Sequence, residues 1–173
     1  MAFEQHSIPQ LELGGNGPRL HFSHANGYPP RVYSQLLEPL TENFAVTASM
    51  HRPLWAESFQ EMPSWHTLGE DLLELLVPRN EAVIGLGHSM GATALVMAAI
   101  RRPELFTSLV LVEPVMVSRR STWLMRYLRP LARRRLPLVA RTLARVDRWP
   151  SQQAAFDHFR PKPVFARLPD SAL

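Results

Sequence analysis

Cysteine is absent from the 173-residue chain. Without it the chain forms no disulfide bond, has no thiol nucleophile and offers no thiolate ligand to a metal ion. This absence excludes cysteine proteases and cysteine-ligated zinc sites from the possible functions. It says little about the compartment in which the protein works.

Long apolar runs are also missing. No hydrophobic stretch reaches the roughly 18 residues that suggest a membrane span, and the N-terminal "MAFEQHSIPQLELGG" lacks the basic start and apolar core of a signal peptide. We therefore expect no membrane span and a cytoplasmic location. The composition, with 46% hydrophobic and 20% charged residues, is typical of a globular protein with a hydrophobic core.

Acidic residues are scarce in the last third of the chain. Residues 1–118 hold 6 Arg and 12 Asp or Glu, whereas residues 119–173 hold 13 Lys or Arg and only 3 Asp or Glu. The change predicts two parts, a core over residues 1–118 and a basic helical segment over residues 119–173. Such a basic segment can bind an anionic surface, but a solvated arginine face is commoner, and we expect no nucleic-acid partner.

Hydrophobic periodicity predicts strands that alternate with helices over the first part of the chain. This alternation indicates an α/β fold with a doubly wound, mostly parallel sheet. The segment "GGNG" between the first two strands predicts a hairpin turn, and the last two strands show the unbroken apolar pattern of strands buried on both faces. The predicted strands are residues 7–13, 19–24, 44–50, 82–87 and 108–113, and the predicted helices are residues 31–41, 65–76 and 90–102.

The segment Gly87-His88-Ser89-Met90-Gly91 joins a predicted buried strand directly to a predicted apolar helix. A tight strand-to-helix turn exposes a serine hydroxyl, and it requires very small residues two positions before and two positions after, which are Gly87 and Gly91. The N–H groups at the start of the helix favour negative charge on an attacked carbonyl oxygen. Ser89 is therefore a candidate nucleophile, and the alternative is a serine in an ordinary glycine turn.

The motif "GHSMGA" resembles the nucleophile turn of the α/β-hydrolase family, and "HANGYPP" resembles the glycine loop that completes its oxyanion hole. The resemblance covers Ser7 to Glu113. It implies that the Met90 and Asn26 N–H groups bind the oxyanion, with Gly27 as the alternative donor, and that His24 braces the loop. His88 is expected to pack or to line the cleft. The segment "MHRPLW" lacks the aspartate that many members carry there, so no role is assigned to Arg52.

The same resemblance implies an acid and then a histidine after the serine. Only His158 of the seven histidines follows Ser89, and it lies in a predicted helix rather than in a loop after a strand. Glu113, at the end of a strand, is the candidate acid, and the alternative is a glutamate that only ends the strand. We therefore expect a hydrolase truncated after the sixth strand with the start of a helical cap, in which residues 108–113 form an apolar edge strand.

The function expected from these features is acyl transfer through Ser89 on a small ester-like substrate, meaning an ester, thioester, amide or carbon–carbon bond. Activity is expected to be weak or absent in this chain because the base is missing. The alternatives are a non-catalytic binding protein of the same fold and an anionic-surface binder at residues 119–148. Nothing in the sequence indicates a cofactor or a metal site, and it leaves the substrate and the oligomeric state open.

Overall fold

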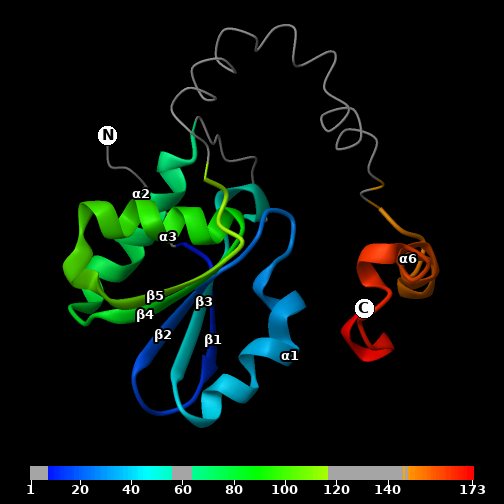
Figure 1. The fold of residues 1–173 in the computed structure, drawn as a ribbon, viewed down its shortest axis with the longest axis horizontal. Helices are drawn as coiled ribbons and strands as arrows, with labels where there is room; N and C mark the ends of the chain where they lie inside the picture. The colour runs from blue at the N-terminus through cyan, green and yellow to red at the C-terminus, as the bar shows by residue number, and fades with distance from the viewer. Residues whose placement is uncertain (1–7, 56–63, 117–145, 147) are drawn as a thin grey trace, which may run out of the picture. The chain divides into compact units, whose positions relative to one another are not determined.

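The computed structural model describes residues 8–55, 64–116, 146 and 148–173, which belong to two compact units, Met1–Met116 and Val117–Leu173 (Figure 1). The first unit contains the sheet and the helices α1 (Ser34–Leu37), α2 (His66–Leu76) and α3 (Met90–Arg101). In the second unit, α6 (Gln152–Phe159) begins at Ser151, whose hydroxyl accepts the Ala154 N–H at 3.1 Å. The basic helices predicted over residues 119–145 lie outside the described residues.

The sheet of the first unit has five strands in the order β1-β3-β2-β4-β5. Strand β1 runs antiparallel to β3, and all other neighbours are parallel. The expected α/β fold with a mostly parallel sheet is confirmed, but the described residues form five strands rather than six. The strands are β1 (Gln10–Gly14), β2 (Arg19–Ser23), β3 (Ala45–Ser49), β4 (Val83–His88) and β5 (Phe106–Val112).

The predicted hairpin between the first two strands is wrong, because β3 lies between β1 and β2. The connecting loop instead crosses the residues that lead into β3. A Cβ atom on Gly15 would lie 2.1 Å from the Phe44 carbonyl oxygen, and Gly15 has a φ of 90°. The glycines of this loop therefore allow a close crossing of two backbones rather than a two-residue turn.

The helix predicted over residues 31–41 is broken into a 3-10 turn at Pro30–Tyr33, the short α1, and a second 3-10 turn at Pro39–Glu42. Pro39 has no N–H group to continue the helical hydrogen bonds of α1. The apolar spacing of Val32, Leu36 and Leu40 in the sequence suggests that these residues form the inward face of a helix, but Val32 and Leu36 are 54% and 51% exposed. Leu37 is the fully buried residue of this segment.

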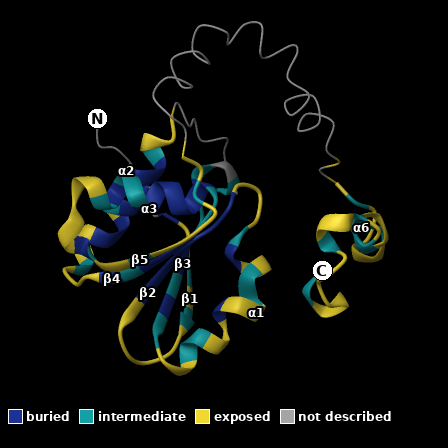
Figure 2. Ribbon diagram, in the orientation of Figure 1, coloured by how far each residue is buried: buried dark blue, intermediate teal, exposed yellow. Residues whose placement is uncertain are grey.

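Helices cover both faces of the sheet, as expected for a doubly wound fold. On one face, Leu20 and Phe22 of β2 pack with Leu37 of α1. On the other face, α2 and α3 pack together through the leucines of α2 and the alanine-rich side of α3 (Figure 2). The buried residues of this second cluster are Leu68, Leu72, Met90, Ala94, Leu95 and Ala98.

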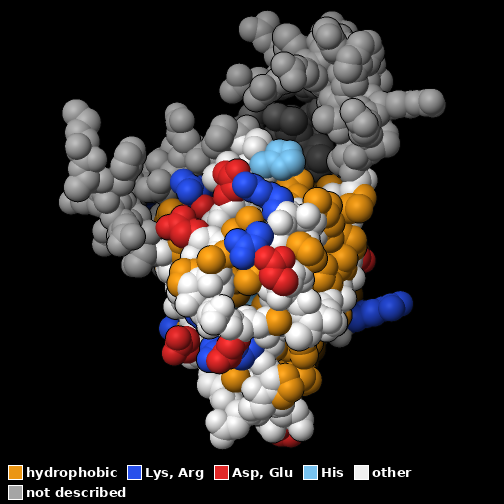
Figure 3. Space-filling view, turned by 90° about the vertical axis from the view of Figure 1, so that its left-hand side faces the viewer, with side chains coloured by type: hydrophobic (Ala, Val, Ile, Leu, Met, Phe, Trp, Pro, Cys, Tyr) orange, Lys and Arg blue, Asp and Glu red, His pale blue; other side chains and the backbone are white. Residues whose placement is uncertain are grey.

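Strand β5 is more exposed than its apolar pattern predicted. Among the described residues it pairs with β4 alone, so it forms an edge of the sheet. Val110 and Val112 remain 50% and 45% exposed, and Figure 3 shows exposed hydrophobic side chains among charged ones on one side of the unit. The prediction of a strand buried on both faces is wrong, whereas the prediction of an apolar edge strand is confirmed for the part of the chain described.

The end of β5 is fastened to α3 by the side chain of Thr93. Its hydroxyl accepts the Val115 N–H at 3.0 Å and lies 3.0 Å from the Val115 carbonyl oxygen. The same hydroxyl is 3.2 Å from the Ser89 carbonyl oxygen. The hydroxyl of one buried threonine thus contacts both the N–H and the carbonyl oxygen of Val115. These contacts fix the segment after β5 against the start of α3.

Buried polar side chains form a layer on the face of β2 and β3 opposite Leu20 and Phe22. His21 is fully buried between two hydroxyl groups, with Nδ1 3.0 Å from Thr47 Oγ1 and Nε2 3.1 Å from Ser49 Oγ. Burial, assisted by the nearby positive charge of Arg79, lowers the pKa of His21 to about 3. His21 is therefore neutral in the folded protein at neutral pH, and both of its ring nitrogens are satisfied.

A second buried pair continues this layer past the ends of the strands. His51 Nε2 lies 3.1 Å from Ser23 Oγ, and the His51 ring lies 4.4 Å from that of His24. Burial is the main cause that lowers the pKa of His51 to about 3, and the neighbouring imidazoles of His24 and His21 add to it. Burial also lowers the pKa of His24. Folding therefore keeps three histidines in the neutral form.

We expect the free energy of unfolding to fall as the pH is lowered from 7 to 5. The unfolded chain binds protons on His21 and His51 below about pH 6.5, whereas the folded chain excludes them until about pH 3. At pH 5 the loss is about 2 kcal/mol each for His21 and His51. Urea unfolding at several pH values measures the effect, and His21→Gln should reduce the pH slope while His158→Gln, at an exposed position, should leave it unchanged. Equal stability at pH 7 and pH 5 would contradict the expectation.

We also expect Thr93→Val to lower the free energy of unfolding by about 1–3 kcal/mol, because it leaves the Val115 N–H without its acceptor. Thr93→Ser keeps the hydroxyl and should cost less. Thr107→Val makes the same chemical change at an exposed position of β5 and serves as the control. Urea unfolding at pH 7 compares the three variants, and equal losses for Thr93→Val and Thr107→Val would refute the role of the hydroxyl.

Candidate functional site

Ser89 lies between the end of β4 and the start of α3, at the carboxyl edge of the parallel strands. Its backbone has φ 53° and ψ −115°, which is a conformation that residues with a Cβ atom rarely adopt. The Ser89 N–H donates to the Val112 carbonyl oxygen at 2.9 Å, so the turn is tied to the end of β5. The side chain is half-buried at the position that open α/β sheets use for ligands.

The two predicted small residues lie where backbones approach closely. A Cβ atom on Gly87 would lie 2.6 Å from Ala92 Cα, and one on Gly91 would lie 2.1 Å from the Ser23 carbonyl oxygen. Neither neighbour is a flexible side chain that moves aside. Any larger residue at either position would therefore displace α3 from β2 or β4, and the glycines are required by the turn itself.

Met90 is the first residue of α3, and its side chain is buried in the cluster between α2 and α3. The first N–H groups of an α-helix have no acceptor within the helix, and the start of a helix carries partial positive charge. Packing therefore fixes the side chain of Met90, the predicted oxyanion donor. Its N–H is one of the first N–H groups of α3, which have no acceptor within the helix.

The loop after β2 contains the second predicted donor. The Tyr28 N–H donates to the Ala25 carbonyl oxygen at 3.1 Å, which closes a four-residue turn. Gly27 has φ 77° and takes the position of the turn that needs positive φ. Asn26 precedes Gly27 in the same turn, is exposed and does not have positive φ.

His24 fastens this loop to the chain after β3. Its Nδ1 lies 2.7 Å from the Ala25 carbonyl oxygen, and its Nε2 accepts the His51 N–H at 3.0 Å. These contacts require the proton of the neutral ring to be on Nδ1. The His24 carbonyl oxygen would be 2.5 Å from a Cβ atom on Gly91. His24 thus connects the glycine loop, the segment after β3 and the start of α3.

Sequence reasoning missed Tyr33, which contacts both parts of the predicted site. Its hydroxyl oxygen accepts the Ala25 N–H at 3.3 Å and lies 2.8 Å from His88 Nδ1. His88 is half-buried, and its ring meets that of Tyr33 edge-on at 5.9 Å. The sequence carried only a weak signal, namely a tyrosine a few residues after the glycine loop.

Arg52 and Asp71 form a second contact that sequence reasoning missed. Arg52 Nε and Nη2 donate to both carboxylate oxygens of Asp71 at 2.8–3.0 Å, and the Asp71 side chain is buried. The Arg52 guanidinium also lies 5.1 Å from the Trp55 ring centroid. Arg52 thus joins the loop after β3 to α2.

Neither the candidate acid Glu113 nor the one histidine that follows Ser89, His158, contributes a hydrogen bond to the turn among the described residues. Glu113 follows β5, is exposed and has φ 46°. His158 belongs to α6 in the second unit, where its Nε2 lies 2.6 Å from Lys162 Nζ and its ring packs on Trp149. Within the described ranges, no imidazole or carboxylate is hydrogen-bonded to the Ser89 hydroxyl. The turn therefore presents a hydroxyl without a bound base.

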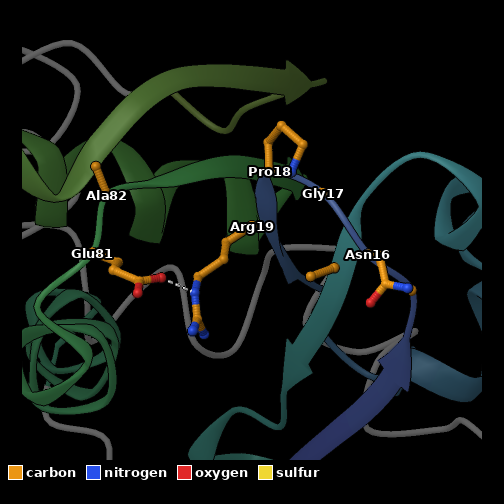
Figure 4. Close-up of a pocket in the computed structure, with 8 residues that line it drawn as sticks. Asn16, Gly17, Pro18, Arg19, Glu81 and Ala82 are labelled. Carbon is orange, nitrogen blue, oxygen red and sulfur yellow. Dashed lines mark hydrogen bonds and ion pairs between the residues drawn. The ribbon is translucent and has the colours of Figure 1, made fainter.

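A hollow of about 600 Å³ opens at the opposite end of the sheet (Figure 4). It is lined by residues 15–18, which connect β1 to β2, and by Arg19 and Glu81, which form an ion pair. Because Arg19 begins β2 and Ala45 begins β3, this hollow lies at the amino ends of the parallel strands. Sites in open α/β sheets lie at the carboxyl ends, so this hollow is separate from the turn at Ser89.

The described part of the chain holds neither a metal-ligand cluster nor a membrane-spanning helix. No group of three or more His, Asp or Glu side chains in it is arranged to hold a metal ion. No helix in the same residues is long and apolar enough to cross a membrane.

Comparison with solved structures shows similarity to hydrolases over part of their length. An N-formylmaleamic acid deformylase from Pseudomonas putida is 29% identical, with a TM-score of 0.57 over 63% of this chain and 44% of that chain. A bacterial membrane phospholipase A is 25% identical, with a TM-score of 0.57 over 63% of this chain and 36% of that one. A thermophilic esterase from Thermogutta terrifontis, at 20% identity and a TM-score of 0.57 over 79% of this chain and 52% of its own, shows the shared fold.

The chain thus spans about half or less of the length of these three proteins. No curated protein sequence matches it significantly. The family model described as "Alpha/beta hydrolase family" matches residues 22–172, which is most of the chain and includes the turn at Ser89. The protein therefore belongs to the alpha/beta hydrolase family.

Proposed function

We propose that the protein is a serine hydrolase that acts by acyl transfer, with Ser89 as the nucleophile. The observation that carries this proposal is the backbone of Ser89, a serine with φ 53° between two glycines whose Cβ atoms would collide with backbone. A protein keeps such a conformation where the surrounding structure enforces it, and these conformations concentrate at functional sites. The deformylase, phospholipase and esterase names of the similar structures support the same class of reaction.

In the proposed reaction, Ser89 Oγ attacks the carbonyl carbon of the substrate while its proton passes to a base. The carbonyl oxygen becomes an oxyanion, which the Met90 and Asn26 N–H groups would bind. Collapse of the intermediate expels the protonated leaving group, and water then releases the acyl group from Ser89. The substrate is a small molecule with an ester, thioester, amide or carbon–carbon bond.

The base is the part of this reaction that the described residues do not supply. Ser89 Oγ has no imidazole partner among them, and Glu113, the candidate acid, is exposed. A serine hydroxyl without a base is a poor nucleophile, and an oxyanion hole alone retains roughly a 10³–10⁴-fold acceleration over water. We therefore infer weak hydrolysis by this chain. The same observation favours the alternative of a binding protein that uses the cleft without turnover.

A fluorophosphonate probe tests the two possibilities. We expect covalent labelling at Ser89, found by mass spectrometry of the digested protein, at a rate well below that of a complete triad because the described residues place no base against the Ser89 hydroxyl. Ser89→Ala should abolish the label, whereas Ser108→Ala, which removes an exposed serine of β5, should leave it unchanged. Absence of label after prolonged exposure of the folded protein would refute the nucleophile and favour the binding protein.

A further inference from the structure

The Tyr33 hydroxyl bridges the two backbone segments that the proposed reaction needs to hold together. On one side it accepts the Ala25 N–H at 3.3 Å, at the first residue of the turn that carries Asn26. On the other side it lies 2.8 Å from Nδ1 of His88, the residue immediately before Ser89. Ala25 and His88 are 63 positions apart in the sequence, so this bridge joins two independent segments.

The Tyr33 hydroxyl can take both roles that the bridge needs. An amide N–H only donates, so the Tyr33 oxygen accepts from Ala25, and the Tyr33 O–H proton stays available to donate to His88. Donation by Tyr33 requires His88 Nδ1 to be the acceptor, which places the proton of a neutral His88 ring on Nε2. Burial raises the pKa of Tyr33, which keeps the phenol protonated and able to donate.

Packing fixes the position of the Tyr33 ring independently of these hydrogen bonds. The ring lies 4.6 Å from that of Phe22, centroid to centroid, and Phe22 is almost fully buried in the core below α1. The His88 ring meets the edge of the same tyrosine. The hydroxyl is therefore placed by the core of the sheet rather than by the exposed loop that it contacts.

We propose that Tyr33 is a positioning residue that sets the distance between the glycine loop and the turn at Ser89, and that it does so by holding His88 in the Nε2–H tautomer. This inference rests on the proposed function, because it concerns the oxyanion donors of that reaction. The His24 side chain hydrogen-bonds the loop to the segment after β3. Tyr33 is the contact that ties it toward β4, and without it the Asn26 N–H is no longer held relative to Ser89.

Tyr33→Phe removes the hydroxyl and keeps the ring, so it tests the bridge with little change in packing. In ¹⁵N-histidine-labelled protein, we expect wild-type His88 to show one tautomer with an unprotonated Nδ1. The variant should show exchange between tautomers and faster hydrogen exchange of the Ala25 amide. Tyr28→Phe makes the same change at an exposed tyrosine of the same loop and should alter neither signal. An unchanged His88 tautomer and unchanged Ala25 exchange in Tyr33→Phe would overturn the proposal.

Reaction with a fluorophosphonate separates positioning from stability. We expect Tyr33→Phe to slow the covalent step at Ser89 by about tenfold to a hundredfold, with little change in the probe concentration that half-saturates it. His88→Leu should slow it similarly, and the double variant should be no slower than the single ones, because both changes break one bridge. Three results would overturn the positioning role: an unchanged covalent rate, additive rate losses in the double variant, or a change only in the probe concentration that half-saturates the reaction.

The two proposals fail in different ways. If wild-type Ser89 takes no label, the nucleophile proposal fails, while the NMR and exchange measurements still decide whether Tyr33 fixes His88 and the loop. If Ser89 is labelled and Tyr33→Phe is labelled at the same rate, the nucleophile stands and the positioning role is refuted. A variant that unfolds would be recognised by its circular dichroism, and His88→Leu would then provide the rate comparison.

Discussion

The close approach of α3 to the end of β2 is the constraint on which the rest of the site depends. At Gly91 the helix backbone lies so near Ser23 and His24 that no Cβ atom fits between them. To reach that position directly from β4, the chain turns at Ser89 with positive φ. The same approach brings the first N–H groups of α3 beside the glycine loop, because that loop continues from His24. One steric contact therefore determines the backbone of the serine and its nearest neighbours.

The polar layer of β2 and β3 holds the end of β2 in the position that contacts α3. Histidines that are buried without charge lose hydration, and here hydroxyl and backbone partners compensate for much of that loss. The layer ties β2 to β3 by side chains as well as by the strand ladder. His24 then extends this connection to the glycine loop from one side, and Tyr33 meets the loop from the other. The loop is exposed, but both of its anchors are buried or half-buried.

The turn at Ser89 and the helices that flank it were predictable because their signals are local. Gly87 and Gly91 have a fixed spacing around the serine, and the apolar stripe of α2 follows the helical period within eleven residues. Strand order was not predictable in this way, because the position of β3 between β1 and β2 depends on pairing between distant segments. The break of α1 at Pro39 did have a local signal, since proline within a helical pattern ends or kinks the helix.

The roles of Asp71 and Tyr33 were not predicted from the sequence, for a different reason. Asp71 looks polar and exposed on a helical wheel, and only its partner Arg52, on a loop 19 positions earlier, explains its burial. Tyr33 likewise acquires its role from Ala25 and His88, which the fold brings to it. Polar contacts across elements depend on the completed fold, so a pattern within one element does not reveal them.

The turn at Ser89 is attached to the end of the edge strand β5 and to the residues that follow this strand. The Ser89 N–H is held by the Val112 carbonyl oxygen, and Thr93 holds Val115 three residues later. Glu113 lies between these two attachments with positive φ, so its position is set by the same backbone contacts that set the serine. The exposed apolar side chains of β5 give that edge little protection against pairing with another strand. Contacts at this edge would therefore act directly on Ser89, through Val112, as well as on the stability of the sheet.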